Sequence, residues 1–177
     1  MPSTLLSKFK TVPGVFVSVI DSAKARIICI GFPLPTCPLA QALVDASTNA
    51  AIRADLMDYG HAENDLRLEV SILSELEHID ATKAVDYPKI LKTGRDGIMV
   101  EHGLRRGILL PQFISEQGWN AEDALTECCL RAGLPYDHWL SGKARVYRFQ
   151  ATIFMEKDPG GEIVMVLPND QLKNELT

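Results

Sequence analysis

The chain has 177 residues, a formal net charge of −5 and 46% hydrophobic side chains, which is typical of a globular protein that folds without disulfides or metals. The acidic balance argues against nucleic-acid binding, and no apolar run is long enough to span a membrane. The first dozen residues lack the apolar core of a signal peptide, so the expected location is the cytoplasm.

The first two predicted elements are the strands of one hairpin. Residues 15–20 and 25–30 are rich in β-branched side chains and are separated by a short polar break, which is typical of two strands joined by a turn. The second run carries apolar residues on both of its faces, and this predicts an interior strand.

A helix and a half-buried strand follow. Pro38 opens the helix, which is expected to end near residues 53–56 and to present small residues along one face. Residues 57–65 are polar and predict a loop. The run 66–72 alternates between apolar and polar residues, so its even-numbered side chains should be buried and its odd-numbered side chains should face water.

The middle of the chain predicts a second hairpin and a short helix. Residues 75–92 show no clean period, and residues 94–97 favour a turn. The apolar runs 98–100 and 108–110 flank another polar break, so they should pair as a hairpin. Residues 111–118 then predict a short helix.

The last third of the chain predicts a longer helix and two strands. Asn120 is a suitable N-cap for this helix, and Gly133 is a suitable residue to end it. Residues 145–155 alternate and predict one long strand. The turn at residues 159–161 leads into a further strand over residues 163–167.

Strands joined by tight turns must be antiparallel, and the helices do not alternate strictly with the strands. The predicted fold class is therefore α+β, with mainly antiparallel sheets and packed helices. We expect residues 1–177 to form a single domain, in which residues 156–177 contribute a hairpin strand and a polar tail.

Cys29 is the first candidate for chemistry because it lies in an apolar run that Gly31 and two prolines bring to an end. A nucleophilic cysteine needs a nearby cation, a histidine or a helix N-terminus that stabilises the thiolate. The alternative is a small core residue, since cysteine is among the most buried residue types. The residue pattern alone favours this alternative.

The other cysteines predict packing rather than chemistry. Cys128 lies on the apolar face of its helix, whereas Cys129 is about 100° further round and is expected to be partly exposed. No cysteine stands two residues from another and no histidine cluster accompanies them, so we expect neither a metal site nor a cofactor. The four histidines are scattered and are predicted at surface or loop positions.

Two polar turns are candidates for ligand contacts. The turn at residues 94–97 presents Arg95 and Asp96 to a ligand, or it only joins two elements. Arg105 and Arg106 are adjacent cations that suit an anion, or they are the solvated residues of a hairpin. The plainer alternative is favoured in both cases.

Two strands carry polar residues that would lie together if the strands paired. Arg67 and Glu69 share the polar face of one strand, and Arg148 and Gln150 share that of another. Pairing would place all four in the floor of a cleft. The alternative is the solvated side of a sheet.

Several of these motifs together resemble the AMMECR domain family. The family hexapeptide Leu-Arg-Gly-Cys-Ile-Gly aligns with residues 26–31, which keep its second half, Cys29-Ile30-Gly31. The similarity keeps its order and spacing across residues 13–155. Beyond the hexapeptide it includes the motifs Leu68–Leu73, Gly94–Gly97, Arg106–Gln112, Gly118–Trp119, Ala132–Pro135 and Val146–Ala151.

The resemblance implies an α+β fold with a larger and a smaller lobe and a cleft near the hexapeptide. Within the family, the chain resembles protein A of the AmmeMemoRadiSam system. Family members often accompany a Memo-like protein and a radical-SAM protein, which implies a shared pathway. The chain departs from the hexapeptide at Ile27 and Ile28, which replace Arg and Gly. The first change removes a fixed charge and five hydrogen-bond donors, so a site that used this arginine would work differently or be lost here.

Two hypotheses about function follow, and they leave open whether the chain is an enzyme. In the first, the chain binds a small anionic metabolite in the cleft, with Cys29 as the reactive group and Glu69 or Asp96 as an acid or base. The ligand contacts in this hypothesis are Gly31, Arg95, Arg106, Gln112 and Arg148. In the second, the chain is a non-catalytic partner of a Memo-like or radical-SAM protein.

Overall fold

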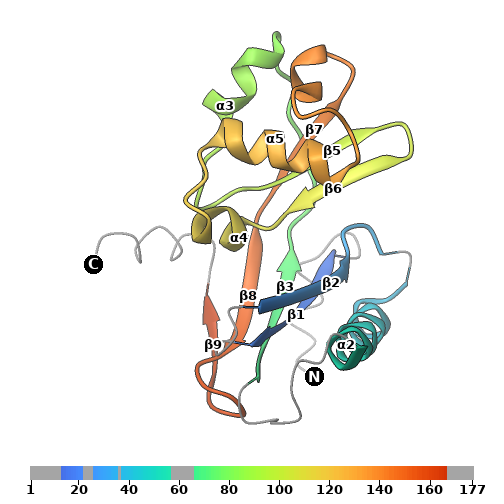
Figure 1. Cartoon of the computed structure of the whole chain (residues 1–177), viewed down its shortest axis with the longest axis vertical. Coiled ribbons are helices and arrows are strands. Elements are labelled where there is room, and N and C mark those ends of the chain that lie inside the picture. Colours follow the sequence, from blue (N-terminus) through green and yellow to red (C-terminus); the bar gives the residue numbers. More distant parts are fainter. Residues whose placement is uncertain (1–12, 22–25, 36, 57–65, 167–177) are drawn as a thin grey trace. The chain divides into compact units, whose positions relative to one another are not determined.

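A computed structural model describes residues 13–21, 26–35, 37–56 and 66–166. It confirms the α+β class, because helices pack against sheets that are built from antiparallel strand pairs (Figure 1). The loop predicted at 57–65, the tail beyond residue 167 and His61 lie outside the described residues.

The described chain divides into two compact units. The first unit consists of residues up to Ser74 together with the segment that begins at Thr152, and the second unit consists of Glu75–Ala151. None of the helices among the described residues is both long enough and apolar enough to cross a membrane.

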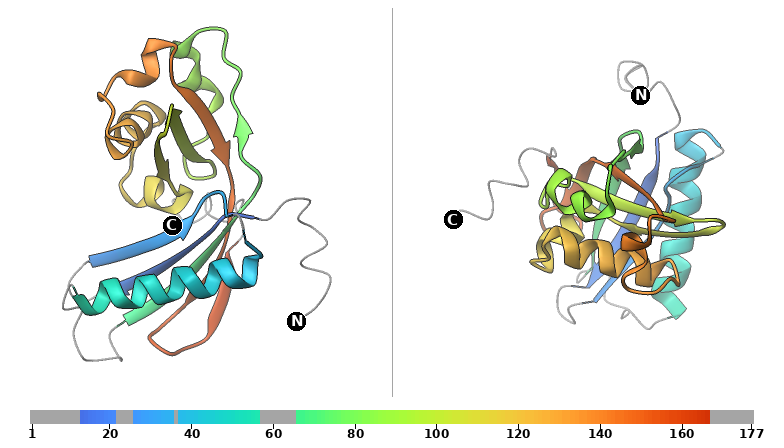
Figure 2. Two further views of the ribbon diagram at one scale, coloured as in Figure 1. Left: turned by 90° about the vertical axis from the view of Figure 1, so that its right-hand side faces the viewer. Right: turned by 90° about the horizontal axis from the view of Figure 1, so that it is seen from above.

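The first unit contains a five-stranded sheet, in the order β2-β1-β3-β8-β9, and one long helix. Its elements are β1 (Val15–Asp21), β2 (Arg26–Phe32), α2 (Leu39–Leu56), β3 (Leu66–Leu73), β8 (Ala151–Glu156) and β9 (Ile163–Val166). Both predicted hairpins of this unit are present, as β1–β2 and β8–β9. The helix α2 begins directly after Pro38, as expected, and lies along one face of the sheet (Figure 2).

The hydrophobic core of the first unit lies between α2 and this face of the sheet. Ala46 and Ala50 of α2 are fully buried against Val17 and Val19 of β1 and Ile28 of β2. The alanines are small, so the helix backbone approaches the sheet closely. The residues that alternate with these, on the opposite face, point away from α2.

The prediction that residues 25–30 form an interior strand is wrong. β2 is the edge strand of the sheet as described, and β1 takes the interior position next to it. Ile28 is buried in the core under α2, whereas Ile27 on the other face is 46% exposed. The apolar residues on both faces of β2 therefore do not mean that both faces are covered.

The strand predicted at residues 66–72 is present as β3, but its predicted burial is reversed at the centre. Leu68 is 49% exposed, while Glu69 and Ser71 are buried. The reason is that α2 packs mainly against β1 and β2 and covers the apolar face of β3 only in part. The first unit thus buries polar side chains on the sheet face that is opposite to α2.

The second unit contains a four-stranded sheet in the order β4-β7-β5-β6, against which α5 packs through β5 and β6. Its elements are β4 (Glu77–His78), η2 (Ala84–Asp86), α3 (Tyr87–Ile90), β5 (Gly97–His102), β6 (Arg105–Leu109), α4 (Pro111–Glu116), α5 (Ala121–Arg131), η3 (His138–Ser141) and β7 (Arg145–Phe149). The hairpin predicted from residues 98–110 is β5–β6. The region without a clean period holds only short elements, which are too brief to show one.

The helix α5 has the predicted caps. The Asn120 side chain accepts hydrogen bonds from the backbone N–H groups of Glu122 and Asp123, at 2.8 and 3.0 Å. Gly133, with a φ of 68°, follows the end of the helix in the left-handed conformation that glycine tolerates. The expectation that Cys129 is partly exposed is wrong, because α5 also contacts η3 and this contact covers a second side of the helix.

The run 145–155, predicted as one strand, consists of two strands in two sheets. β7 ends at Phe149 and β8 begins at Ala151. β7 lies between β4 and β5, and β8 lies between β3 and β9. The alternation of side chains continues through Gln150, so the sequence pattern does not mark the change of sheet.

Candidate functional site

Two of the predicted catalytic residues lie on one face of the sheet of the first unit. Ser18 of β1 pairs in register with Cys29 of β2 on one side and with Glu69 of β3 on the other. Directly paired residues project from the same face of an antiparallel sheet. Cys29, Ser18 and Glu69 therefore form one row across three strands, the Cys29 row. Since neighbouring strands lie about 4.8 Å apart, the backbones of Cys29 and Glu69 are roughly 10 Å apart.

The Cys29 row combines an exposed thiol with buried polar groups. Cys29 is exposed, Ser18 is buried, and Glu69 is only 7% exposed. The Ser18 hydroxyl is placed to donate a long hydrogen bond of 3.5 Å to Glu69 Oε1. Carboxylates are seldom buried unless a partner or a function keeps them there. The buried Glu69 is therefore the observation that distinguishes this face from an ordinary solvated sheet.

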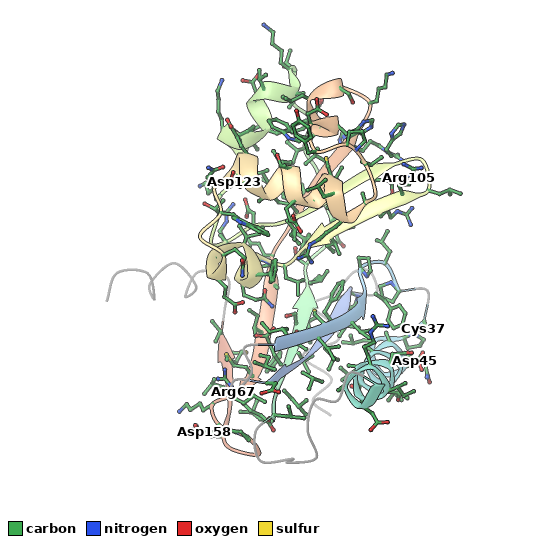
Figure 3. The ribbon with its side chains drawn as sticks, in the orientation of Figure 1. Cys37, Asp45, Arg67, Arg105, Asp123 and Asp158 are labelled. Carbon is green, nitrogen blue, oxygen red and sulfur yellow. The ribbon has the colours of Figure 1, made fainter. Side chains whose placement is uncertain are left out.

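Arg67 brings a cationic side chain to the same face. Ile20 of β1 pairs with both Ile27 of β2 and Arg67 of β3, so these three residues form the row next to the Cys29 row. Arg67 Nη1 donates to the Lys157 carbonyl at 3.4 Å, while its Nε is buried without a hydrogen-bond partner among the described residues (Figure 3). The guanidinium of this face thus comes from β3 and bonds to Lys157, which follows β8, whereas the hexapeptide would supply an arginine from β2, where this chain has Ile27.

Gly31 lies beyond Cys29 on the same face, and it has a packing role. A Cβ atom on Gly31 would lie 2.1 Å from the Val15 carbonyl oxygen and 2.6 Å from Phe16. Phe16 pairs with Gly31 in register and is buried. Because Gly31 has no side chain, Phe16 can occupy the space over it, and Phe16 thus lies next to the Cys29 row on one side.

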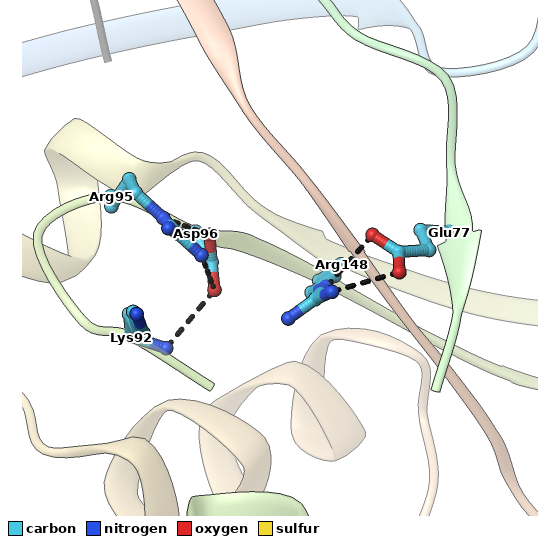
Figure 4. Close-up of polar contacts among 5 residues, drawn as sticks. All are labelled: Glu77, Lys92, Arg95, Asp96 and Arg148. Atoms are coloured by element: carbon cyan, nitrogen blue, oxygen red, sulfur yellow. Dashed lines mark hydrogen bonds and ion pairs between the residues drawn. The ribbon is translucent and has the colours of Figure 1, made fainter. Parts of the chain in front are cut away.

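Asp96 and Arg95 stabilise their own turn in the second unit. Asp96 is 2% exposed. Its Oδ1 accepts a hydrogen bond from Arg95 Nε at 2.8 Å, and its Oδ2 accepts one from the Lys92 backbone N–H at 3.0 Å (Figure 4). The predicted turn is confirmed, and these contacts account for the burial of Asp96 without a ligand.

Arg148 forms a two-pronged ion pair with Glu77. Its Nε and Nη2 donate to the two carboxylate oxygens at 2.9 and 2.8 Å (Figure 4). The hydrogen bond from Arg148 lowers the pKa of Glu77, and the same bond raises the pKa of Arg148. Such a bidentate pair holds the guanidinium in a fixed orientation.

Arg106 is also occupied by a carboxylate. Arg106 and Arg145 both donate to Glu101, which is buried on β5. The hydrogen bond from Arg106 is the main reason that the pKa of Glu101 is lowered. All three arginines proposed as anion contacts, Arg95, Arg106 and Arg148, therefore have a carboxylate partner inside the second unit.

The two strands do not bring the four residues of the predicted polar floor together in one sheet. The strand of Arg67 and Glu69 lies next to β8, the second half of the run 145–155. Arg148 belongs instead to β7 in the other sheet, and Gln150 lies between the two strands. The remaining predicted contact, Gln112, lies in α4 and is half-buried.

The four cysteines differ sharply in accessibility. Cys29 is exposed and Cys37 is half-buried, whereas Cys128 and Cys129 are fully buried. Burial raises the pKa of both Cys128 and Cys129, which disfavours the reactive thiolate. No group of three or more potential metal ligands occurs within the described ranges.

The sequence analysis did not single out Ser18. A signal was present, because Ser18 is the one polar residue in the run Val15–Ile20. A polar residue inside an apolar interior strand needs a hydrogen-bond partner. That Ser18 pairs with both Cys29 and Glu69, however, follows from the order of the strands in the sheet, which could not be predicted from the sequence.

The chain is similar to a known protein family and to individual proteins over most of its length. A family model described as AMMECR1 matches residues 2–154. A protein of Methanothermobacter thermautotrophicus is 40% identical over 158 residues, which cover 88% of this chain and 82% of that protein. A protein of Methanocaldococcus jannaschii is 42% identical over 138 residues, which cover 77% of this chain and 69% of the relative.

A solved structure agrees with these relatives. The crystal structure of the uncharacterized protein PH0010 from Pyrococcus horikoshii matches with a TM-score of 0.80 at 35% sequence identity. The match covers 94% of this chain and 84% of the other. Since the family model spans most of the chain and the relatives are similar over most of their length, the chain belongs to the AMMECR1 family.

Proposed function

We propose that the chain binds a small anionic ligand at the Cys29 row and that Cys29 is the group that reacts with it. The observation that supports this most is an exposed thiol in register with a buried hydroxyl–carboxylate pair, Ser18 and Glu69. Arg67 in the next row supplies the positive charge that attracts an anion. Ile27, exposed two residues from Cys29, offers apolar surface to the rest of the ligand.

The chemistry that this row favours is addition of the Cys29 thiol to a carbonyl carbon of the ligand. The S–C bond forms as the carbonyl π bond breaks, and the thiol proton ends on the carbonyl oxygen. Glu69 and Ser18 relay this proton, since the Ser18 hydroxyl already points to the Glu69 carboxylate. No group on the protein is consumed except the thiol, which the reverse reaction restores.

The test compares a charged and a neutral alkylating reagent at Cys29. Iodoacetate is an anion and iodoacetamide is its neutral analogue, so the ratio of their rates reports the local potential. We expect this ratio to be higher at Cys29 than at Cys37, and we expect Arg67→Gln to lower it at Cys29. A unit charge about 12 Å away in water changes such a rate by less than about twofold. Site-resolved mass spectrometry of native protein gives both rates in one sample.

The matched control is Arg53→Gln, which removes the same charge from the last turn of α2. It should leave the ratio at Cys29 unchanged, and neither variant should change the ratio at Cys37. Equal ratios at the two cysteines of the unmodified protein would show that no cation serves Cys29, and the proposed anion site would be rejected.

The second candidate function is a non-catalytic partner of a Memo-like or radical-SAM protein. The position of β2 at the edge of the sheet, among the described residues, favours it, because another strand can add to the edge of a sheet. Here Cys29→Ser should preserve co-purification with such a partner, while Ile27→Lys on the exposed side of β2 should reduce it. A complex that is insensitive to Ile27→Lys would count against docking at this edge.

A further inference from the structure

A pocket of about 530 Å³ is lined entirely by residues of the second unit. One wall is the β5–β6 turn, from His102 to Arg105, and the other is the segment that follows α5, with Leu134, Pro135 and His138. The volume falls within the range of small-molecule sites, which is roughly 300–1,000 Å³. The two walls come from segments that are far apart in the sequence, residues 102–105 and residues 134–138, so the pocket is a product of the fold.

Two contacts hold the walls of this pocket together. The imidazole rings of His102 and His138 are stacked, with centroids 4.5 Å apart and an interplanar angle of 14°. Arg105 Nη1 donates to the Gly133 carbonyl at 2.9 Å and thereby ties the hairpin to the end of α5. A pocket that is held in shape before binding costs its ligand less ordering entropy.

The charge at the pocket is positive. Arg105 makes no ion pair with any residue that the structure describes, and its remaining donors, Nε and Nη2, have the fork geometry that matches a carboxylate. The nearby Glu101 does not compensate this charge, because Arg106 and Arg145 already occupy it. Asp137 is the sequence neighbour of His138, and no ion pair joins it to Arg105 in the described chain. Figure 3 labels Arg105 on this hairpin.

The rest of the pocket surface is mainly apolar. Leu134 and Pro135 line one side, and Leu104 at the tip of the hairpin is fully exposed. His138 Nε2 is buried and has no hydrogen-bond partner among the described residues.

We infer that this pocket binds a small aromatic carboxylate. The carboxylate pairs with the Arg105 fork, and the flat ring packs against the imidazoles and Leu134. The inference does not depend on the proposed function, because every residue involved belongs to the second unit.

The experiment is a titration of the full chain with benzoate, followed by the NMR signals of the His102 and His138 rings. Saturable shifts of both rings are expected. Arg105→Gln should weaken benzoate binding about tenfold, which corresponds to the loss of one charge-assisted contact, and Arg105→Lys should give an intermediate affinity. Lys89→Gln is the control, since it removes an equal charge from an exposed residue of the same unit that pairs with Asp86 outside the pocket, and it should leave the affinity unchanged.

Two analogues separate the contributions of charge and ring. Benzamide keeps the ring without the charge, and cyclohexanecarboxylate keeps the charge without the flat ring, so both should bind more weakly than benzoate. The inference is overturned if benzoate causes no saturable shift, if Lys89→Gln weakens binding as much as Arg105→Gln, or if benzamide binds as tightly as benzoate. Unchanged thermal unfolding of the Arg105 variants excludes loss of the fold as the cause.

Discussion

Glu69 and Glu101 are both buried carboxylates, but their surroundings give them different roles. Glu101 accepts hydrogen bonds from two guanidinium groups, those of Arg106 and Arg145. Its charge is therefore balanced within the second unit, and the fold alone explains its burial. Glu69 meets the Ser18 hydroxyl on a face that also carries an exposed thiol. The proposed ligand site therefore includes Glu69, whereas Glu101 has a structural role.

Replacement of Glu101 by Gln should destabilise the protein by about 1–2 kcal/mol at pH 7, since two partly exposed arginines lose their partner. The lowered pKa of Glu101 sets the pH range of this effect. The contribution is complete above the unfolded-state pKa of about 4.3 and is lost as the pH falls through the lower folded-state pKa. Urea unfolding at pH 7 and in acid measures it.

The surface pair Glu127–Arg131 provides the control for this prediction. Glu127→Gln should change the free energy of unfolding by less than about 0.5 kcal/mol at pH 7. If Glu101→Gln cost no more than Glu127→Gln, or cost the same in acid as at pH 7, the structural role given to Glu101 would be wrong.

The close contact between β6 and α5 depends on Gly107, which has no side chain. A Cβ atom on Gly107 would lie 2.0 Å from the Cys128 carbonyl oxygen and 2.8 Å from the Ala132 nitrogen. Both are backbone atoms of α5 or its end, so they cannot move aside alone. The thiol of Cys128 also donates to the Gly107 carbonyl at 3.2 Å. The helix and the strand are thus in direct backbone contact.

Gly107→Ala should therefore destabilise the protein by about 3 kcal/mol or more, as expected for overpacking against rigid atoms. Gly103→Ala is the matched control in the same hairpin, where a Cβ would meet no atom within 4 Å. Its cost should be about 1 kcal/mol, which reflects only the positive φ of 62°. Thermal unfolding of both variants measures the difference, and similar costs would contradict the close contact.

The elements themselves were largely predictable from local patterns. The alternation in 66–72, the proline before α2 and the cap at Asn120 each depend on neighbouring residues, and each element was found. What failed was the assignment of burial, as at Leu68 and Glu69. Alternation decides which side chains share a face, whereas coverage of that face depends on distant elements that the local pattern does not contain.

At the scale of the whole molecule, the arrangement of strands decides which residues meet. Cys29 and Glu69 could be named as candidates from the sequence, but their alignment through Ser18 required β1 to lie between β2 and β3. The pairing of His102 with His138 depends in the same way on where η3 packs. The change of sheet near Gln150 left no local signal, and this separated Arg148 from the strand that lies next to β3.

The most direct test of the ligand site is whether the carboxylate of Glu69 influences the sulfur of Cys29. At neutral pH, Glu69→Gln should speed alkylation of Cys29 by iodoacetamide about twofold, because removing a negative charge roughly 10 Å away favours the thiolate. The rate at Cys37 in the same protein should not change. An unchanged rate at Cys29 in a folded Glu69→Gln variant would contradict the account, since the thiol and the buried carboxylate would then not share one site.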